Sequence, residues 1–294
     1  MNNGYKDRFD LWVIPKMILF TLLAAAVESP LRIFVEAVIE GKEGAPDFVT
    51  PVFLVYGFCS KMMFAAGYML LGHMLPIKNT VLRGFGYVML IFASSYLPNI
   101  LALAGGDGEI IEESLSFWIV IVDTLSYVIM GVVLGLLMKK YDPPKTKKPH
   151  LADKRVFILM CVLNASVFAA LNYLTDVAAG AFSSSWRLCS ILGVSKAHET
   201  SFYIVFTAFM FAAGLLIPLW YRYCMPGDIS LRGALLFSLK LSAAAWLPNV
   251  LIMAFFGTPV LLTAAYGAAY VLMIAVCVMI YRKINRQIIP KQTV

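Results

Sequence analysis

The sequence predicts an all-α integral membrane protein with eight transmembrane helices, arranged as two parallel four-helix repeats of the same topology. Three observations predict this fold class: an apolar composition, eight apolar segments of spanning length, and short strings that recur in the same order in both halves. Of the 294 residues, 61% are hydrophobic and 14% are charged, whereas soluble domains average about 45–50% and about 25%. This composition excludes a soluble enzyme, a disordered chain and a nucleic-acid-binding module.

A helix needs about 20 mostly apolar residues to cross the hydrocarbon core of a bilayer. The sequence contains eight such segments, each of which begins and ends near charged residues, Gly or Pro. They cover residues 11–28, 51–74, 84–104, 115–138, 156–175, 201–221, 233–256 and 259–281. The first segment has the least clear end, because apolar residues continue past Pro30 to Ile39 while Arg32, Glu36 and Glu40 form a second face. This piece is either an interfacial amphipathic helix or the tilted end of the first span.

The charges of the loops predict the orientation. The linker at residues 139–155 carries seven Lys and Arg against two Asp, and the loop between the third and fourth spans carries four acids and no base. Cytoplasmic loops of membrane proteins are enriched in Lys and Arg, so the linker is predicted to be cytoplasmic. Eight spans then place both termini in the cytoplasm of a cell-membrane protein. The same bias accounts for the net charge of +7 without a nucleic-acid partner.

Four strings recur between the two halves at separations of 147, 149, 150 and 143 residues. They are MFAAG at 63–67 and 210–214, Leu-Arg-Gly at 82–84 and 231–233, aromatic-Leu-Pro-Asn at 96–99 and 246–249, and Tyr-Val-aliphatic-Met at 127–130 and 270–273. The order predicts a first repeat at 1–138, the basic linker at 139–155 and a second repeat at 156–294. Four spans are an even number, so both repeats enter the membrane from the same side. By analogy with transporters, a site is expected between them.

Pro98 and Pro248 lie in the outer halves of the third and seventh spans, and each is followed by an asparagine. A proline inside a helix leaves the carbonyl four residues before it without a partner and bends the helix. Each proline is therefore predicted to kink its span. Asn99 and Asn249 either clasp neighbouring helices or line a binding site that uses the freed carbonyls.

Lys61 and Asp123 lie inside the second and fourth spans at similar depth, where an ionisable side chain costs about 2.5–3.5 kcal/mol on insertion scales. The two can pair if their spans touch, either as a structural salt bridge or as a substrate-binding or proton-relay site. Their repeat counterparts are about Ala208 and Tyr266, so these charges are not duplicated. Glu28 is expected at the outer interface or facing a vestibule together with Asn99 and Asp123.

No nucleotide-binding, hydrolase or metalloprotease motif occurs, so no enzymatic activity, cofactor or metal is predicted. A glycine pair, Gly131 and Gly135, predicts a close helix contact within the bundle or between protomers. The preferred prediction is a small secondary transporter or solute-binding protein for a small polar or anionic solute, with Lys61, Asp123, Asn99 and Asn249 between the repeats. The alternative is a membrane scaffold or a subunit of a larger membrane complex, as a homo-oligomer or with a partner subunit. A wet centre favours the first, and a dry centre with paired charges favours the second.

Overall fold

The computed structural model describes residues 13–39, 51–96, 117–138, 154–224, 230–247, 250 and 258–288, and every regular element in these ranges is helical. In chain order they are α1 (Val13–Phe34), η2 (Val35–Ile39), α2 (Pro51–Leu70), η4 (Gly72–Met74), α3 (Thr80–Ile91), η5 (Phe92–Tyr96), α6 (Phe117–Leu137), α7 (Lys154–Phe182), η6 (Ser184–Trp186), α8 (Leu188–Ile191), α9 (Glu199–Cys224), α10 (Leu231–Leu241), η7 (Ser242–Trp246) and α12 (Val260–Ile288).

Five of the described helices are long and apolar enough to cross a membrane: α1, α6, α7, α9 and α12. They make the chain compatible with a multi-pass membrane protein. The other three predicted spans correspond to α2, to α3 with η5, and to α10 with η7. The number eight and the repeat arrangement therefore stay predictions.

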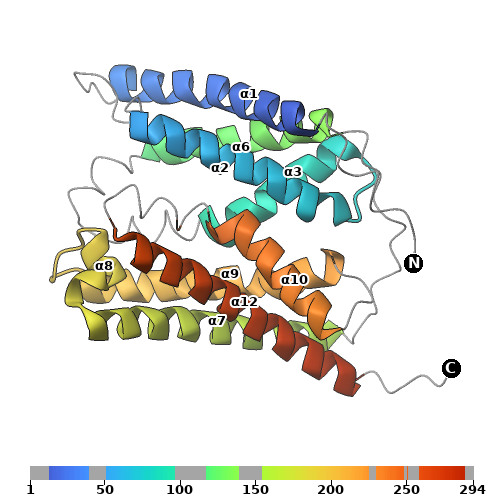
Figure 1. Ribbon diagram of the computed structural model, residues 1–294, viewed down its shortest axis with the longest axis vertical. Helices are drawn as coiled ribbons and strands as arrows, with labels where there is room; N and C mark the ends of the chain where they lie inside the picture. The colour runs from blue at the N-terminus through green and yellow to red at the C-terminus, as the bar shows by residue number, and fades with distance from the viewer. Residues whose placement is uncertain are drawn as a thin grey trace.

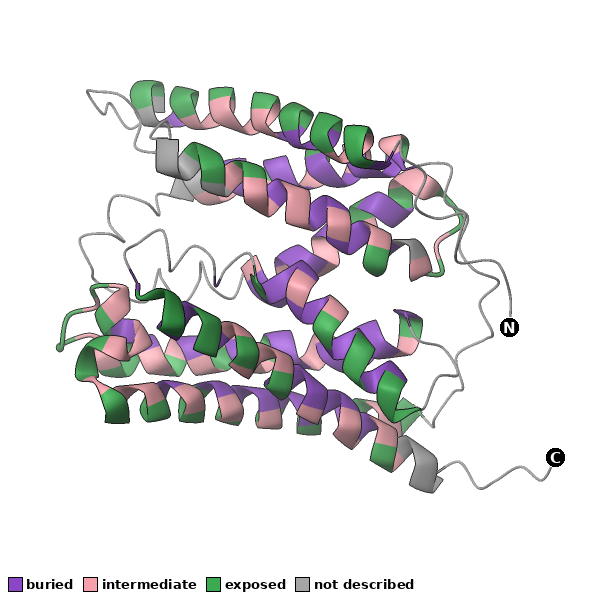
Figure 2. Cartoon of the chain, viewed as in Figure 1, coloured by how far each residue is buried: buried purple, intermediate pink, exposed green. Residues whose placement is uncertain are grey.

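The surface of the helices is apolar where a soluble protein would be polar. Figure 2 shows exposed residues along the outward faces of α1, α7 and α12, and these faces carry large side chains such as Leu22, Leu159 and Leu261. A soluble monomer rarely exposes so much contiguous apolar surface. A bilayer covers it without cost, because lipid tails are as apolar as these side chains.

The helices form two groups, which lie at the top and bottom of Figure 1. In the first group α1 packs against α2 and α6, and α3 packs along α6; in the second, α7 packs against α9 and α12, and α10 packs against α12. The α3–α6 contact is close because glycines meet there. A Cβ atom on Gly84 would lie 2.5 Å from the backbone nitrogen of Gly135. The Gly131–Gly135 pair is thus used inside the bundle.

The two groups meet through α2 and η5 of the first group and α9 and η7 of the second. α2 contacts η7, α9 contacts η5, and η5 contacts η7. The indole nitrogen of Trp220 in α9 donates to the Ser94 hydroxyl in η5 at 3.1 Å. A Cβ atom on Gly67 in α2 would lie 2.7 Å from the Ala244 Cβ in η7. This part of the contact is therefore tightly packed.

Two helix ends differ from the sequence prediction. α1 continues through Pro30 and passes into the π-helical η2, so the piece after Pro30 is a continuation of the first helix. Neighbouring helices and local π-helical adjustment make an internal proline tolerable in a membrane helix. α7 runs to Phe182, beyond the predicted end at Thr175, and so brings Asp176 into the helix.

Candidate functional site

A π-helical segment stands directly before each predicted kink. η5 contains Ser94 and η7 contains Ala244, the residues whose carbonyls the prolines were expected to free. The Ser94 hydroxyl donates to the Leu90 carbonyl at 2.6 Å, which gives one backbone acceptor a partner inside the wider helical turn. Pro98, Asn99, Pro248 and Asn249 themselves lie outside the described residues.

Four charged side chains form a continuous network in the first helix group. Lys61 Nζ in α2 lies 2.7 Å from Glu28 Oε2 in α1. Arg32, one turn after Glu28, lies 3.2 Å from its other carboxylate oxygen. Nη2 of the same guanidinium donates to Asp123 Oδ1 in α6 at 2.5 Å. Two cations and two carboxylates make the network formally neutral.

Lys61 and Asp123 therefore belong to one network but are joined through Glu28 and Arg32 rather than directly. The reason is the position of α1, which packs against both α2 and α6 and places its own side chains between theirs. The sequence signal was the four-residue spacing of Glu28 and Arg32, which puts both on one helix face. The predicted first span ends at residue 28 and leaves Arg32 outside it, so the prediction did not use this spacing.

Two members of the network are buried, and the other two, which form its rim, are partly exposed. The Lys61 and Asp123 side chains are 9% and 4% exposed, whereas those of Glu28 and Arg32 are 21% and 24% exposed. A buried charge that loses its partner costs several kcal/mol. The mutual neutralisation explains how two ionisable residues can lie deep in the first group. Chemically, the arrangement clasps three helices, and its carboxylates are also groups that can hold a proton.

A second polar cluster, which the sequence analysis missed, surrounds Asp176 in α7. The Asp176 carboxylate accepts from the backbone nitrogen of Leu188 at 2.6 Å and from the Tyr203 hydroxyl at 2.5 Å. The Tyr266 hydroxyl lies 3.4 Å away and Arg187 Nε lies 3.6 Å away. Arg187 also pairs with Glu199. The predicted fifth span, residues 156–175, stops one residue before Asp176 and so leaves this acid out of the helix.

The Asp176 cluster leaves little empty space. A cavity of about 20 Å³ lies beside it, lined among others by Asn172, Thr175 and Tyr270. A water molecule needs roughly 10–15 Å³ and two to four polar partners, so this cavity has room for a single water. It is too small for an organic solute.

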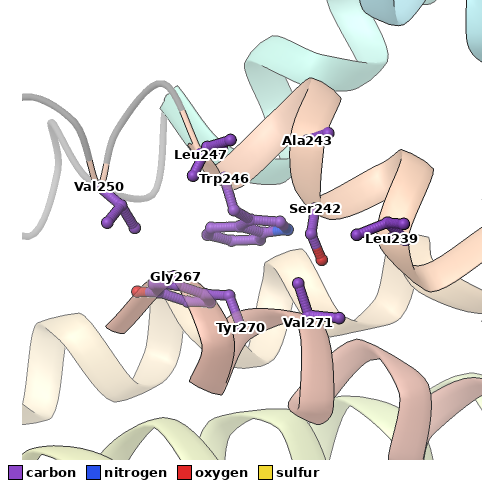
Figure 3. A pocket seen from close by; sticks show the side chains of 9 residues that line it. All are labelled: Leu239, Ser242, Ala243, Trp246, Leu247, Val250, Gly267, Tyr270 and Val271. Carbon is purple, nitrogen blue, oxygen red and sulfur yellow. The ribbon is translucent and has the colours of Figure 1, made fainter. Parts of the chain in front are cut away.

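A further cavity of about 50 Å³ lies between α12 and the α10–η7 segment (Figure 3). The indole ring of Trp246 stacks on the Tyr270 ring at 5.0 Å between centroids and 11° between planes. Ser242 is buried, and its hydroxyl has no hydrogen-bond partner among the described residues. The rest of the lining is almost wholly apolar.

Metal-binding and disulfide chemistry have no candidate in the described part of the chain. No group of three or more His, Cys, Asp or Glu side chains is placed to hold a metal ion there. The five cysteines are free thiols, and four of them are buried.

Comparison of the chain with models of known families, with curated proteins and with solved structures finds no match. The function must therefore be argued from the geometry.

Proposed function

We propose that this chain is a non-catalytic membrane scaffold or complex subunit, built of two parallel four-helix repeats and eight spans. The observation that carries the proposal is the contact between the two helix groups. Its described part is closely packed, and the buried charges Lys61, Asp123 and Asp176 have partners within their own helix groups.

The contacts support the repeat arrangement independently of the recurring strings. Exchanging the groups converts the α2–η7 contact into the α9–η5 contact, while the η5–η7 contact maps onto itself. This reciprocity is the property of an interface around a two-fold axis. Within the groups, three main helix pairs also correspond: α1–α2 with α7–α9, α1–α6 with α7–α12, and α3–α6 with α10–α12. A pseudo-two-fold axis along the membrane normal is the arrangement that two parallel repeats require.

The polar clusters fit the same correspondence. Glu28 and Asp176 stand 148 residues apart, and each lies on the first helix of its group. Asp123 and Tyr266, on the last helices, stand 143 residues apart and contact Arg32 and Asp176 respectively. An acid on the first helix that is tied to neighbouring helices is thus common to both groups. A duplicated position favours a structural role in holding each four-helix group together.

The size of the cavities argues against an occupied solute site. Pockets that bury a drug-sized ligand have volumes of about 300–1,000 Å³. The two cavities described above have volumes of about 50 and 20 Å³ and lie within the second group. The centre between the groups instead contains ring contacts, such as Tyr87 with Trp220 at 6.1 Å.

The proposal includes a location and an orientation. The protein lies in the cell membrane, with the basic linker and both termini on the cytoplasmic side. Its partners are the lipid bilayer and either a second copy of the chain or another membrane subunit. The linker's positive charge is on the side where anionic lipids also concentrate.

Water access to two buried positions tests the scaffold against the transporter. Single cysteines would replace Lys61 and Ser95, a buried residue of the η5 segment that contacts α9 and η7, in a cysteine-free background. Intact and permeabilised cells would be treated with a membrane-impermeant maleimide. Ser184→Cys, on the exposed segment after α7, is the positive control. The scaffold predicts labelling at 184 and none at 61 or 95. Labelling at 95 in folded protein would show an aqueous path between the groups and refute it.

One observation favours the secondary transporter as the second candidate. The rim of the charge network is a fifth to a quarter exposed, so Lys61 and Asp123 are one side chain away from the surface. In that case Asp123 would carry a proton or act as a counter-ion, and Lys61 would bind an anionic group. Labelling at 61 that a solute blocks would support this function.

A further inference from the structure

The π-helical segments η5 and η7 differ at their first residue, and a cavity lies beside that residue in η7. In the first group three rings meet: Phe92 lies 4.9 Å from Tyr127 and 5.4 Å from Tyr96, and Tyr96 lies 4.7 Å from Tyr127. The proposed repeat pairs Tyr96 with Trp246 and Tyr127 with Tyr270. These two rings also meet in the second group. The residue that corresponds to Phe92 is Ser242, so the third ring is missing.

The cavity occupies the place of that ring. It has a volume of about 50 Å³ and is lined by Ser242, Trp246 and Tyr270 together with apolar side chains. Replacing a phenylalanine by a serine removes the ring and adds a hydroxyl at the bottom of the space. Figure 3 shows the Ser242 hydroxyl pointing toward Val271, and the indole nitrogen of Trp246 on the side that faces Ser242. Two hydrogen-bonding groups therefore converge on one small apolar hollow.

The cavity opens toward the bilayer. Leu239 and Leu247 line it and are 54% and 37% exposed, whereas Ser242 is buried. Ser242 lies eleven residues after Leu231, where α10 begins. At about 1.5 Å per residue, it is roughly 16 Å into a hydrocarbon core that is about 30 Å thick. An occupant at this depth comes from the membrane rather than from water.

We infer that this cavity is a binding site for a membrane-dissolved, ring-shaped lipophile that carries an oxygen acceptor at its edge, of the phenol or quinone type. The space beside Ser242 takes the oxygen-bearing edge of the ring, the Trp246–Tyr270 stack supplies a flat wall, and Ser242 supplies a donor. A hydroxyl in hydrocarbon without a partner costs free energy, which an oxygen acceptor on the occupant recovers.

The volume limits how far the occupant enters. A dry cavity of about 150 Å³ holds a whole benzene molecule, so a cavity of about 50 Å³ takes only the oxygen-bearing edge of a ring. The remainder of the molecule lies between Leu239 and Leu247 at the lipid surface. This geometry suits an amphiphile with a ring head and an apolar tail in the bilayer. It does not suit a solute that arrives from water.

Quenching of tryptophan fluorescence by brominated rings tests the site in the full-length chain in phosphatidylcholine nanodiscs. The probe is 4-bromophenol, and bromobenzene is its matched control without the oxygen. Ser242→Phe restores the ring of the first group, and Ser242→Ala removes the hydroxyl but keeps the space. We expect saturable quenching of the wild type by 4-bromophenol, and loss of the saturable part in Ser242→Phe. In Ser242→Ala we expect a fivefold to tenfold weaker apparent affinity, about one hydrogen bond.

Two results would overturn the inference. Equal saturable quenching of the wild type and Ser242→Phe would place the bound probe elsewhere. Equal affinity of the wild type for both probes would mean that a lipid chain or any apolar group fills the hollow. If Ser242→Phe does not fold, Ser242→Ala with the two probes still decides. These variants report on the second group alone, so a negative result leaves the scaffold proposal, which is tested at positions 61 and 95, unaffected.

Phe92→Ser tests the inference by a gain of binding in the first group. The first group has the corresponding ring pair, Tyr96 and Tyr127, so removal of the Phe92 ring should open a second cavity with a hydroxyl, and Tyr96→Trp in the same variant supplies the fluorescent indole. The expected result is a second saturable component with 4-bromophenol in protein whose circular dichroism matches the wild type. Its absence in such folded protein would contradict the ring-replacement argument.

Discussion

At the scale of residues, the charge network shows how four ionisable side chains can lie in an apolar bundle. None of the four is tolerable alone at that depth, since breaking a buried pair costs about 3–5 kcal/mol. The pairs are linked in series from Lys61 to Asp123. Removing one member therefore leaves a net charge that the remaining three must share.

Because the four charges are linked in series, we expect one substitution to destabilise the protein and a second to restore part of the lost stability. Lys61→Met should lower the free energy of unfolding by about 2–4 kcal/mol, because Glu28 loses its closest cation. Adding Glu28→Gln restores neutrality and should recover more than half of the loss, leaving the Arg32–Asp123 pair intact. Unfolding in mixed detergent measures both variants. A double variant less stable than Lys61→Met would mean that the two side chains act separately.

Tyr203 offers a second test with a matched control in the chain. Its hydroxyl donates to the buried Asp176 carboxylate, and hydrogen bonds to charged groups contribute about 1.5–3 kcal/mol. Tyr203→Phe should lower the free energy of unfolding by about that amount. Tyr173→Phe, in a half-exposed ring of α7 that contacts Tyr203, should leave it unchanged within about 0.5 kcal/mol. Equal effects would show that the Tyr203 hydroxyl contributes nothing through Asp176.

At the scale of elements, glycine positions decide how closely helices approach. The Leu-Arg-Gly string places Gly84 where α3 crosses α6, and the neighbouring atoms are backbone atoms of Gly135. Backbone atoms cannot turn aside as a flexible side chain can. The contact therefore depends on the missing side chain and not on any conformational freedom of the glycine.

Gly84→Ala should destabilise the protein by about 2–4 kcal/mol, at or above the upper end of typical overpacking costs. Gly57→Ala is the control, because a Cβ atom there meets only Lys61 Nζ at 3.6 Å. That substitution should be neutral or stabilising by up to about 1 kcal/mol, the difference in helix propensity. Thermal unfolding in detergent compares the two. An equal loss in both variants would indicate a general intolerance of alanine.

The sequence predicted the positions of the helices better than the contacts of their charged side chains. Apolar segments located the described helices, whereas the π-helical segments before the two prolines are not visible in the sequence pattern. The predicted fifth span stops at Thr175, although the helix continues and the Asp176 carboxylate accepts from the Leu188 backbone nitrogen and the Tyr203 hydroxyl. The partners of Lys61 and Asp123 depended on which helix lies between α2 and α6, and periodicity carries no information on that choice.

At the scale of the whole molecule, orientation follows from charge and can be measured without a function. The positive-inside rule places the linker at 139–155 in the cytoplasm and the segment that contains Ser184 outside. In intact cells the impermeant maleimide should label Ser184→Cys but not Lys145→Cys, and permeabilisation should expose the second. The opposite pattern would invert the topology and contradict the orientation that the positive-inside rule assigns.

The scaffold proposal finally predicts that the two helix groups hold together without the chain that joins them. A protease site inserted within residues 143–149 of the full-length protein should allow cleavage, after which both fragments should still elute together in detergent. Trp220 lies at their contact, where it is buried against Tyr87 and bonded to Ser94. Trp220→Ala should therefore weaken the association, because truncation of a buried tryptophan costs about 3–5 kcal/mol.

Trp186→Ala provides the control, since Trp186 packs within the second group against Phe182 and away from the contact. Its cleaved fragments should elute together like those of the wild type. A transporter that rocks its halves about a central site needs an interface that opens at modest cost. Cleaved wild-type fragments that separate freely would thus favour that function, whereas fragments that separate only after Trp220→Ala would identify the aromatic contact as the permanent core of the molecule.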